Sequence, residues 1–198
     1  VFFPRVNGVS TSIATFRDAL RAHGVEVRLI APRYDREAEA HGVVRIPGRR
    51  LPFDPEDRLV RLRAMRRLIR VRPDVKMILC GEPHPEFPVA ELIRSLGLDA
   101  HVRLMGYVPI EDFTGYISAC DIILNLRFPT VGESSGTLLR SLGLGRAVVV
   151  SNVGSFAEFP DSICLKTPVD ATEEDTLYEY LNLLVSRPGV ARAMGARA

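Results

Sequence analysis

The chain has 198 residues, of which 46% are hydrophobic and 25% charged, values typical of a folded protein with one large domain or two small ones. Its formal net charge is only +2, so the chain lacks the strong positive charge of a nucleic-acid-binding protein. Nucleic acid is therefore not expected as a partner. The apolar runs fall short of the roughly 18 residues that a membrane-spanning helix requires, and no signal peptide is visible.

The first residues predict a β-α-β unit. Residues 1–4 have the pattern of a strand end, residues 11–23 that of an amphipathic helix, and residues 25–31 that of an alternating strand. Asn7 and Gly8 then fall at the turn between the first strand and the helix. In open α/β sheets this turn is a frequent ligand-binding position. The alternative is a tight turn that binds nothing.

An arginine-rich helix is expected over residues 56–72, after a short strand at 43–46 and an irregular, proline-rich segment at 47–55. Its basic residues are Arg58, Arg61, Arg63, Arg66, Arg67, Arg70 and Arg72, and a rough apolar stripe runs beside them. Basic amphipathic helices of this kind can lie on anionic membrane surfaces. The alternative is a helix whose basic face is simply solvated.

From Pro73 onwards, apolar strands alternate with helical segments. Strands are expected at residues 75–80, 101–105, 121–126 and 147–150, and helices at residues 88–96, 110–119 and 137–144. The remainder is expected to be a tail with a helix at 173–186 and a short helical end. This alternation predicts an α/β fold with a parallel sheet that helices cover on both faces. Because such connections are right-handed, we expect one rim of the sheet to hold Glu82, Tyr107, residues 127–136 and residues 152–158.

The most informative turn is Gly-Glu-Ser-Ser-Gly-Thr, residues 132–137, directly before a helix. Its glycines let the backbone approach a ligand closely, and Ser134 or Ser135 can cap the helix. The free N–H groups of the first helical turn and the helix dipole favour a phosphate or diphosphate. Glu133 would repel phosphate, so it is better suited to accept hydrogen bonds from sugar hydroxyls. The turn therefore predicts a nucleotide-sugar site, the alternative being an ordinary capped turn.

The three cysteines, Cys80, Cys120 and Cys164, are widely spaced and show neither a C-x-x-C motif nor the spacing of metal ligands. This pattern predicts core packing in a reducing compartment rather than a disulfide or a metal site. We therefore expect a cytoplasmic protein.

The order of these features resembles glycosyltransferase family 4, retaining enzymes of the GT-B fold, in which two Rossmann-like domains face each other across a cleft. The matching residues are Leu104-Met105-Gly106-Tyr107-Val108, then Phe113, Tyr116, Ala119 and Asp121, then Glu133-Ser134-Ser135-Gly136, and finally the stretch from Gly145 to Ser155 that closes with Glu158. They follow the family's order and spacing over residues 73–158. Residues 2–31 are also similar to the start of the family's N-terminal domain.

The resemblance implies a role for each of these positions. Three would border the nucleotide base: Gly106, Tyr107 and Val108. Four would offer backbone N–H groups to the donor diphosphate: Ser134, Ser135, Gly136 and Thr137. Two would approach the diphosphate from the other domain: Asn7 and Gly8. Glu133 would act in catalysis by holding hydroxyls of the donor sugar, and the dipoles around the leaving diphosphate would make a metal ion unnecessary.

The sequence departs from the family pattern in three ways. Ser141 stands where the family has its second carboxylate, after Glu133. No arginine–lysine pair that would grip the diphosphate is found between Arg58 and Asp74. A complete member is considerably longer than 198 residues, so we expect a truncated or composite chain. Residues 1–67 would be an incomplete N-terminal Rossmann-like domain with the arginine-rich helix, and residues 68–198 the nucleotide-sugar-binding domain.

The resemblance implies a bacterial glycosyltransferase that moves a sugar from a nucleotide-diphosphate sugar to a hydroxyl acceptor with retention of configuration. The acceptor, a glycan or a lipid-linked molecule, is not identified by the sequence, and no cofactor is expected. The alternative is a non-catalytic nucleotide-binding or scaffolding module that kept the fold. Weak contact with the anionic inner face of the membrane is a further hypothesis.

Overall fold

The computed structural model describes residues 8–32, 43–46, 62–83, 87–128, 130 and 134–198. The chain divides into two compact units, residues 1–53 and residues 54–198, and each is described by itself. The domain boundary expected at residues 67 and 68 falls inside a helix that packs within the second unit.

The first unit contains α1 (Gly8–Ala22), β1 (Leu29–Pro32) and β2 (Val43–Ile46). The two strands pair in parallel, with Leu29 opposite Val43. Phe16 and Leu20 on α1 are exposed. A Rossmann-like domain is assembled from several β-α-β units. One helix beside two strands is therefore only part of such a domain, as the sequence predicted.

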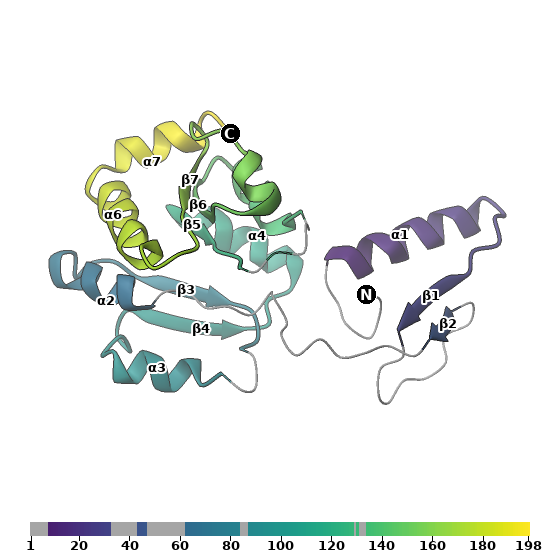
Figure 1. The fold of residues 1–198 in the computed structure, drawn as a ribbon, viewed down its shortest axis with the longest axis horizontal. Coiled ribbons are helices and arrows are strands. Elements are labelled where there is room, and N and C mark those ends of the chain that lie inside the picture. Colours follow the sequence, from purple (N-terminus) through teal and green to yellow (C-terminus); the bar gives the residue numbers. More distant parts are fainter. Residues whose placement is uncertain (1–7, 33–42, 47–61, 84–86, 129, 131–133) are drawn as a thin grey trace. The chain divides into compact units, whose positions relative to one another are not determined.

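The second unit is an α/β structure with two parallel sheets (Figure 1). One sheet pairs β3 (Met77–Cys80) with β4 (Val102–Gly106). The other contains β5 (Ile122–Asn125), β6 (Ala147–Ser151) and β7 (Cys164–Thr167), in that order. The helical elements are α2 (Leu62–Val71), α3 (Val89–Ser95), α4 (Ile110–Ala119), α5 (Gly136–Gly143), the 3-10 turn η2 (Gly154–Glu158), α6 (Glu173–Ser186) and α7 (Pro188–Gly195).

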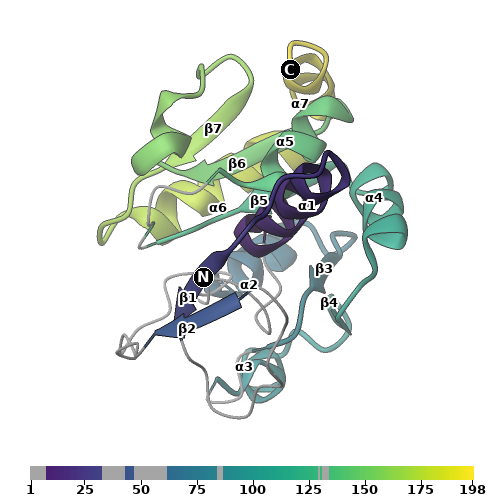
Figure 2. The ribbon, with the colours of Figure 1, turned by 90° about the vertical axis from the view of Figure 1, so that its right-hand side faces the viewer.

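Both faces of β6 are buried, and every residue of this strand is inaccessible to solvent. Ala147 and Val149 pack with α6 and α7 on one face, whereas Val148 and Val150 pack with α5 and η2 on the other. This alternation follows from the two-residue period of a strand. An unbroken Ala-Val-Val-Val run is the sequence expected for a parallel strand covered on both sides, and Figure 2 shows α5 and α6 on either side of β6.

The arginine-rich helix packs against α6. Leu62, Met65 and Leu68 of α2 are almost fully buried, and they share one core cluster with Leu177, Leu181 and Leu184 of α6. Because this apolar face is covered by protein, it is not available to insert into a membrane surface in this unit. The described part of the chain contains no helix long and apolar enough to cross a bilayer.

One arginine of α2 is also held by α6. The guanidinium of Arg67 forms an ion pair with Asp175 and lies 4.2 Å from the ring centroid of Tyr178, a cation–π distance. Arg63, Arg66 and Arg70 stay exposed. The helix is therefore solvated on its basic face and buried on the other.

The sequence prediction located most elements to within a few residues. The strand at 43–46 and the helices at 110–119 and 173–186 match β2, α4 and α6. The first part of the helix expected at 56–72 lies outside the described residues. The prediction of a tail after residue 158 was wrong for β7. The four residues of this strand include Lys166, so the sequence gave only a weak strand pattern. Lys166 reaches the Ala157 carbonyl at 3.0 Å and Asp161 at 2.7 Å, so its charge is satisfied in the strand.

We expect Leu68→Ala to lower the free energy of unfolding by about 2–5 kcal/mol, because it opens a cavity between α2 and α6. The control is Val71→Ala on the same helix, where the side chain is 56% exposed and the change should stay within about 0.5 kcal/mol. Urea unfolding followed by circular dichroism measures both. Equal effects of the two substitutions would show that α2 does not pack in the core.

Candidate functional site

The turns at the carboxyl ends of the strands carry the site residues predicted from the sequence. Gly106 ends β4 with φ of +65°, a left-handed conformation that favours glycine. Its carbonyl accepts a hydrogen bond of 2.8 Å from the amide of Gly81, which joins the ends of β3 and β4. Tyr107 follows with 71% of its surface exposed, and Val108 is half-buried. An exposed aromatic ring beside a bent backbone offers a surface on which a planar group can stack.

The start of α5 is fixed by a buried hydroxyl. Ser135 is the N-cap residue, and its Oγ accepts a hydrogen bond of 3.2 Å from the amide of Leu138. The same hydroxyl donates to Oδ1 of Asn125 at the end of β5, at 3.1 Å. Ser135 is 3% exposed and Asn125 is 6% exposed. This pair ties the helix start to the strand end, so the first turn of α5 is held at the edge of the sheet.

Asn125 carries an unsatisfied donor. Its Nδ2 is buried and has no hydrogen-bond partner among the described residues. The oxygen is already engaged with Ser135, so the amide nitrogen remains the free end of the side chain. A buried donor without an acceptor is costly, and sites that bind a ligand are one place where such groups persist. Among the residues that the structure describes, none supplies an acceptor to this group.

A positive charge lies over the first turn of α5. A Cβ built on Gly136 would come within 2.8 Å of Nη1 of Arg140, one turn along the helix, so the guanidinium folds back across Gly136. A side chain at this position would displace the guanidinium from this place. The exposed N–H end of the helix and the guanidinium together favour an anion. Arg140 was not among the site residues predicted from the sequence. The only signal for it was its position four residues after a glycine at the expected start of a helix.

The turns after β5 and β6 complete the rim of this site. The amide of Arg127 donates to Oγ of the buried Ser151 at 2.9 Å, which links the two strand ends. Gly154 begins η2 with φ of +53°, and a Cβ there would lie 2.7 Å from Cγ2 of Thr130. A hollow of about 350 Å³ lies between α5 and η2; its polar lining residues are Ser134, Ser135, Ser155 and Glu158.

The structure brings together some of the predicted residues and not others. Ser134, Ser135, Gly136 and Thr137 form the start of α5, and Ser135 rather than Ser134 is the cap. Gly106, Tyr107 and Val108 follow the other sheet. Asn7 and Glu133 lie outside the described residues, and Gly8 is the first residue of α1 in the first unit.

Ser141, which replaces the second carboxylate expected from the family pattern, faces the protein interior. It is fully buried, and its hydroxyl donates to the Thr137 carbonyl at 2.7 Å within α5. The side chain therefore belongs to the core beneath the site and offers nothing to a ligand in this arrangement.

The cysteines do not have the properties of nucleophiles. Burial raises the pKa of the thiols of Cys80, Cys120 and Cys164, so the reactive thiolate is disfavoured at neutral pH. All three are free thiols. Within the described ranges, no three histidine, cysteine or acidic side chains are grouped so that they could hold a metal ion.

Comparison with known proteins gives matches over residues 6–198. The profile of Glycosyltransferase Family 4 matches residues 6–100, and that of Glycosyl transferases group 1 matches residues 59–198. A curated relative, the MMP alpha-(1->4)-mannosyltransferase of Mycolicibacterium hassiacum, is 27% identical over 177 residues, which cover 87% of this chain and 40% of the relative.

Solved structures have the same fold. Anabaena HepE in complex with UDP and glucose has a TM-score of 0.60 at 19% identity, over 94% of this chain and 46% of HepE. WaaG, a glycosyltransferase involved in lipopolysaccharide biosynthesis, has a TM-score of 0.60 at 16% identity, over 97% of this chain and 46% of WaaG. The chain thus spans less than half the length of these proteins.

We expect Ser135→Ala to lower the free energy of unfolding by about 1–3 kcal/mol, because it removes the cap of α5 and the hydrogen bond to Asn125. Ser134→Ala, at the neighbouring exposed position, is the matched control and should change the free energy of unfolding by less than about 0.5 kcal/mol. Thermal or urea unfolding distinguishes the two. If Ser134→Ala proves the more damaging, the assignment of the cap is wrong.

Proposed function

Because the chain belongs to the family Glycosyl transferases group 1, we propose that it is part of a glycosyltransferase and carries the site for a nucleotide-diphosphate sugar donor. The observation that carries this proposal is the first turn of α5. There Gly136 is exposed beneath the guanidinium of Arg140, and the cap Ser135 is hydrogen-bonded to Asn125, whose buried Nδ2 has no partner among the described residues. These donors and this positive charge are the chemistry that a diphosphate requires.

In this proposal the diphosphate lies at the start of α5. The backbone N–H groups of Gly136 and Thr137 and the guanidinium of Arg140 would hold its oxygens, since both carry partial or full positive charge. Tyr107 and Val108, after Gly106, would border the base. UDP is the nucleotide bound in the HepE structure to which this chain is similar, so UDP is the first nucleotide to test.

The proposed reaction transfers the sugar from the nucleotide to a hydroxyl acceptor with retention of configuration. Glu133 would hold hydroxyls of the donor sugar. The negative charge that develops on the leaving diphosphate would be stabilised by the fixed dipoles of α5 and by Arg140. The proposal needs no metal ion and no cofactor. Asn7 and Gly8 would approach the same diphosphate from the N-terminal unit of the complete protein, and the acceptor would be a glycan or a lipid-linked molecule in the cytoplasm.

A second candidate is a non-catalytic nucleotide-binding module with the same fold. It is motivated by Ser141, which is buried and hydrogen-bonded inside α5 where the family pattern places a carboxylate. In that case nucleotide binding would persist without sugar transfer.

We expect the chain to bind UDP or another nucleoside diphosphate. Arg140→Ala should weaken this binding by about 10–100-fold, because it removes a hydrogen bond to a charged group that contributes about 1.5–3 kcal/mol. Arg94→Ala, which removes an exposed arginine from α3, is the control and should leave affinity unchanged. Calorimetric titration with UDP, GDP and ADP, with and without EDTA, measures both. Equal losses in the two variants would indicate nonspecific charge attraction, and loss on adding EDTA would contradict a metal-free site.

The effect of Glu133→Ala on catalysis is tested in a protein that spans the whole length of its relatives. We expect sugar transfer to fall by at least about a hundredfold, whereas UDP affinity should change by less than about threefold. The reason is that the carboxylate would contact the sugar rather than the diphosphate. Glu133→Gln is the matched variant that keeps the size of the side chain. Unchanged turnover in both variants would remove Glu133 from the mechanism. Absence of transfer in the unmodified protein, with UDP still bound, would favour the non-catalytic module.

A further inference from the structure

The proposed nucleotide site leaves one part of the ligand without a partner. Tyr107 would border the base and the start of α5 would hold the diphosphate, but the ribose that joins them meets no acceptor in that arrangement. Hydroxyls that leave water lose free energy unless a new acceptor faces them. Ser141 cannot be that acceptor, because it is buried and its hydroxyl donates to the Thr137 carbonyl inside α5.

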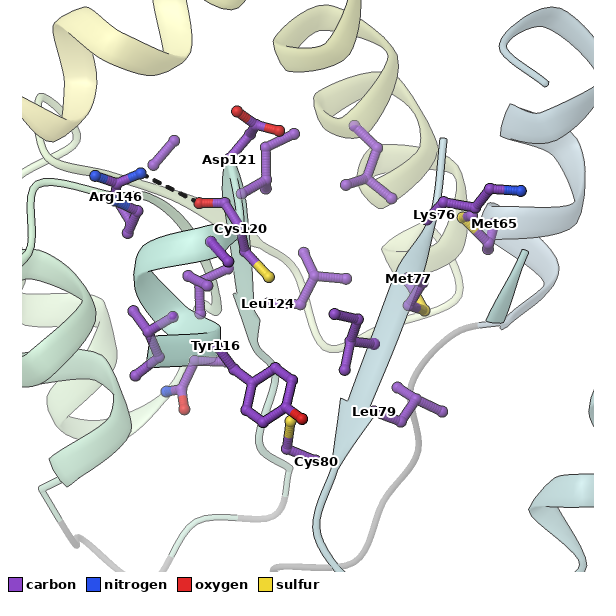
Figure 3. A pocket seen from close by; sticks show the side chains of 18 of the residues that line it. Met65, Lys76, Met77, Leu79, Cys80, Tyr116, Cys120, Asp121, Leu124 and Arg146 are labelled. Carbon is purple, nitrogen blue, oxygen red and sulfur yellow. Dashed lines mark hydrogen bonds between the residues drawn. The ribbon is translucent and has the colours of Figure 1, made fainter. Parts of the chain in front are cut away.

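The order of the strands places the end of β3 between these two parts of the site. One edge of β3 pairs with β4, which leads to Tyr107, and its other edge faces β5 across a cavity. Figure 3 shows β3 and β5 on opposite sides of this cavity, with Lys76 and Asp121 at one end and Cys80 towards the other. β5 ends at Asn125, which is hydrogen-bonded to the cap of α5. A nucleotide that reaches from Tyr107 to the start of α5 therefore passes over the end of β3.

The end of β3 carries an exposed carboxylate. Glu82 follows Gly81 directly after the strand and lines the same cavity. Among the described residues, Glu82 has no hydrogen-bond or ion-pair partner. Its backbone is restrained on both sides, because the Gly81 amide donates to the Gly106 carbonyl at 2.8 Å and Pro83 disfavours a helical conformation for the residue before it. The carboxylate is thus held close to the end of β4, with both of its oxygens able to accept.

The other acidic side chains nearby are placed differently. Glu111 and Asp112 lie in the first turn of α4, where they complement the helix dipole, and neither lines the cavity. Asp74 and Asp121 do line it, but each precedes its strand and so lies at the opposite edge of the sheet. Among the described carboxylates that line the cavity, Glu82 alone follows a strand.

From this arrangement we propose that Glu82 is the ribose-binding residue of the site, and that its carboxylate accepts hydrogen bonds from the 2′- and 3′-hydroxyls of the nucleotide. This inference rests on the proposed nucleotide-sugar site. The two oxygens of a carboxylate match the two neighbouring hydroxyls of a ribose, and an acidic residue holds ribose hydroxyls in the same way in dinucleotide-binding folds. Glu82 thereby makes the site selective for ribonucleotides over 2′-deoxyribonucleotides.

The test compares each nucleotide with its 2′-deoxy form. UDP, GDP, ADP and their 2′-deoxy forms are titrated by calorimetry into the unmodified chain and into the variants Glu82→Ala and Glu82→Gln. Because Glu82 is exposed, both substitutions should leave the fold intact, which circular dichroism checks. Glu111→Gln is the matched control, since it removes the same charge from an exposed position that does not line the cavity.

We expect the unmodified chain to bind its preferred ribonucleotide about 10–100-fold more tightly than the 2′-deoxy form, the effect of one hydrogen bond to a charged group. Glu82→Ala should lower this ratio to less than about threefold, because the charged acceptor is gone. Binding of the 2′-deoxy form should stay equal or become tighter, because a negative charge near the diphosphate is removed. Glu82→Gln, which keeps one acceptor oxygen, should retain part of the ratio, and Glu111→Gln all of it.

The outcomes separate this inference from the proposed function. An unchanged ratio in Glu82→Ala, with the ribonucleotide still bound, overturns the role of Glu82 and leaves the proposed function in place. Equal weakening of both forms in Glu82→Ala shows a merely structural role and also overturns it, as does a loss of the ratio in Glu111→Gln. If the unmodified chain binds none of the three ribonucleotides, the proposed function and the role of Glu82 are both overturned.

Discussion

Burial of β6 on both faces is the constraint on which the second unit depends. One face of its Ala-Val-Val-Val run requires α6 and α7, and the other requires α5 and η2. Leu138 and Leu142 hold α5 to that strand, which leaves the first turn of the helix at the carboxyl edge of the sheet. The proposed affinity of the rim for an anion would therefore follow from core packing, because the same contacts that bury α5 leave its first turn at the edge of the sheet.

Polar contacts hold the neighbouring strand ends of the rim together. Ser135 reaches Asn125, and Ser151 accepts from the amide of Arg127, so the ends of β5, β6 and α5 form one hydrogen-bonded set. Groups held in this way are already oriented before a ligand arrives, which lowers the cost of ordering them on binding. Arg140 adds full charge to the same edge, close to the backbone of Gly136. The site thus combines fixed dipoles with one adjustable cation.

Much of this arrangement could be predicted from the sequence. The period-two and helical patterns identified β3 to β6 and α3 to α6, and the position of the Gly-Ser-rich turn located the start of α5. Side-chain partners could not be predicted, because Ser134 and Ser135 are equally good caps by type, and only the structure shows that Ser135 is buried and caps the helix. Arg140 was missed for the same reason, since its orientation depends on the absence of a side chain at Gly136.

The strand β7 was missed because four residues with a central lysine carry little period-two signal. The separation of β3 from β5 has no local sequence pattern, since it concerns which strands become neighbours.

One edge of β3 and one edge of β5 are paired with no described strand, which also bears on how the chain behaves in a cell. Natural edge strands are protected by charge, proline or short length; these two are short, with four residues each, but carry the apolar sequences Met-Ile-Leu-Cys and Ile-Ile-Leu-Asn without a charged residue or a proline. Such edges are templates for pairing with unfolded polypeptide. Apolar strand edges of this kind are also features that chaperones and proteases recognise when a chain is partly unfolded.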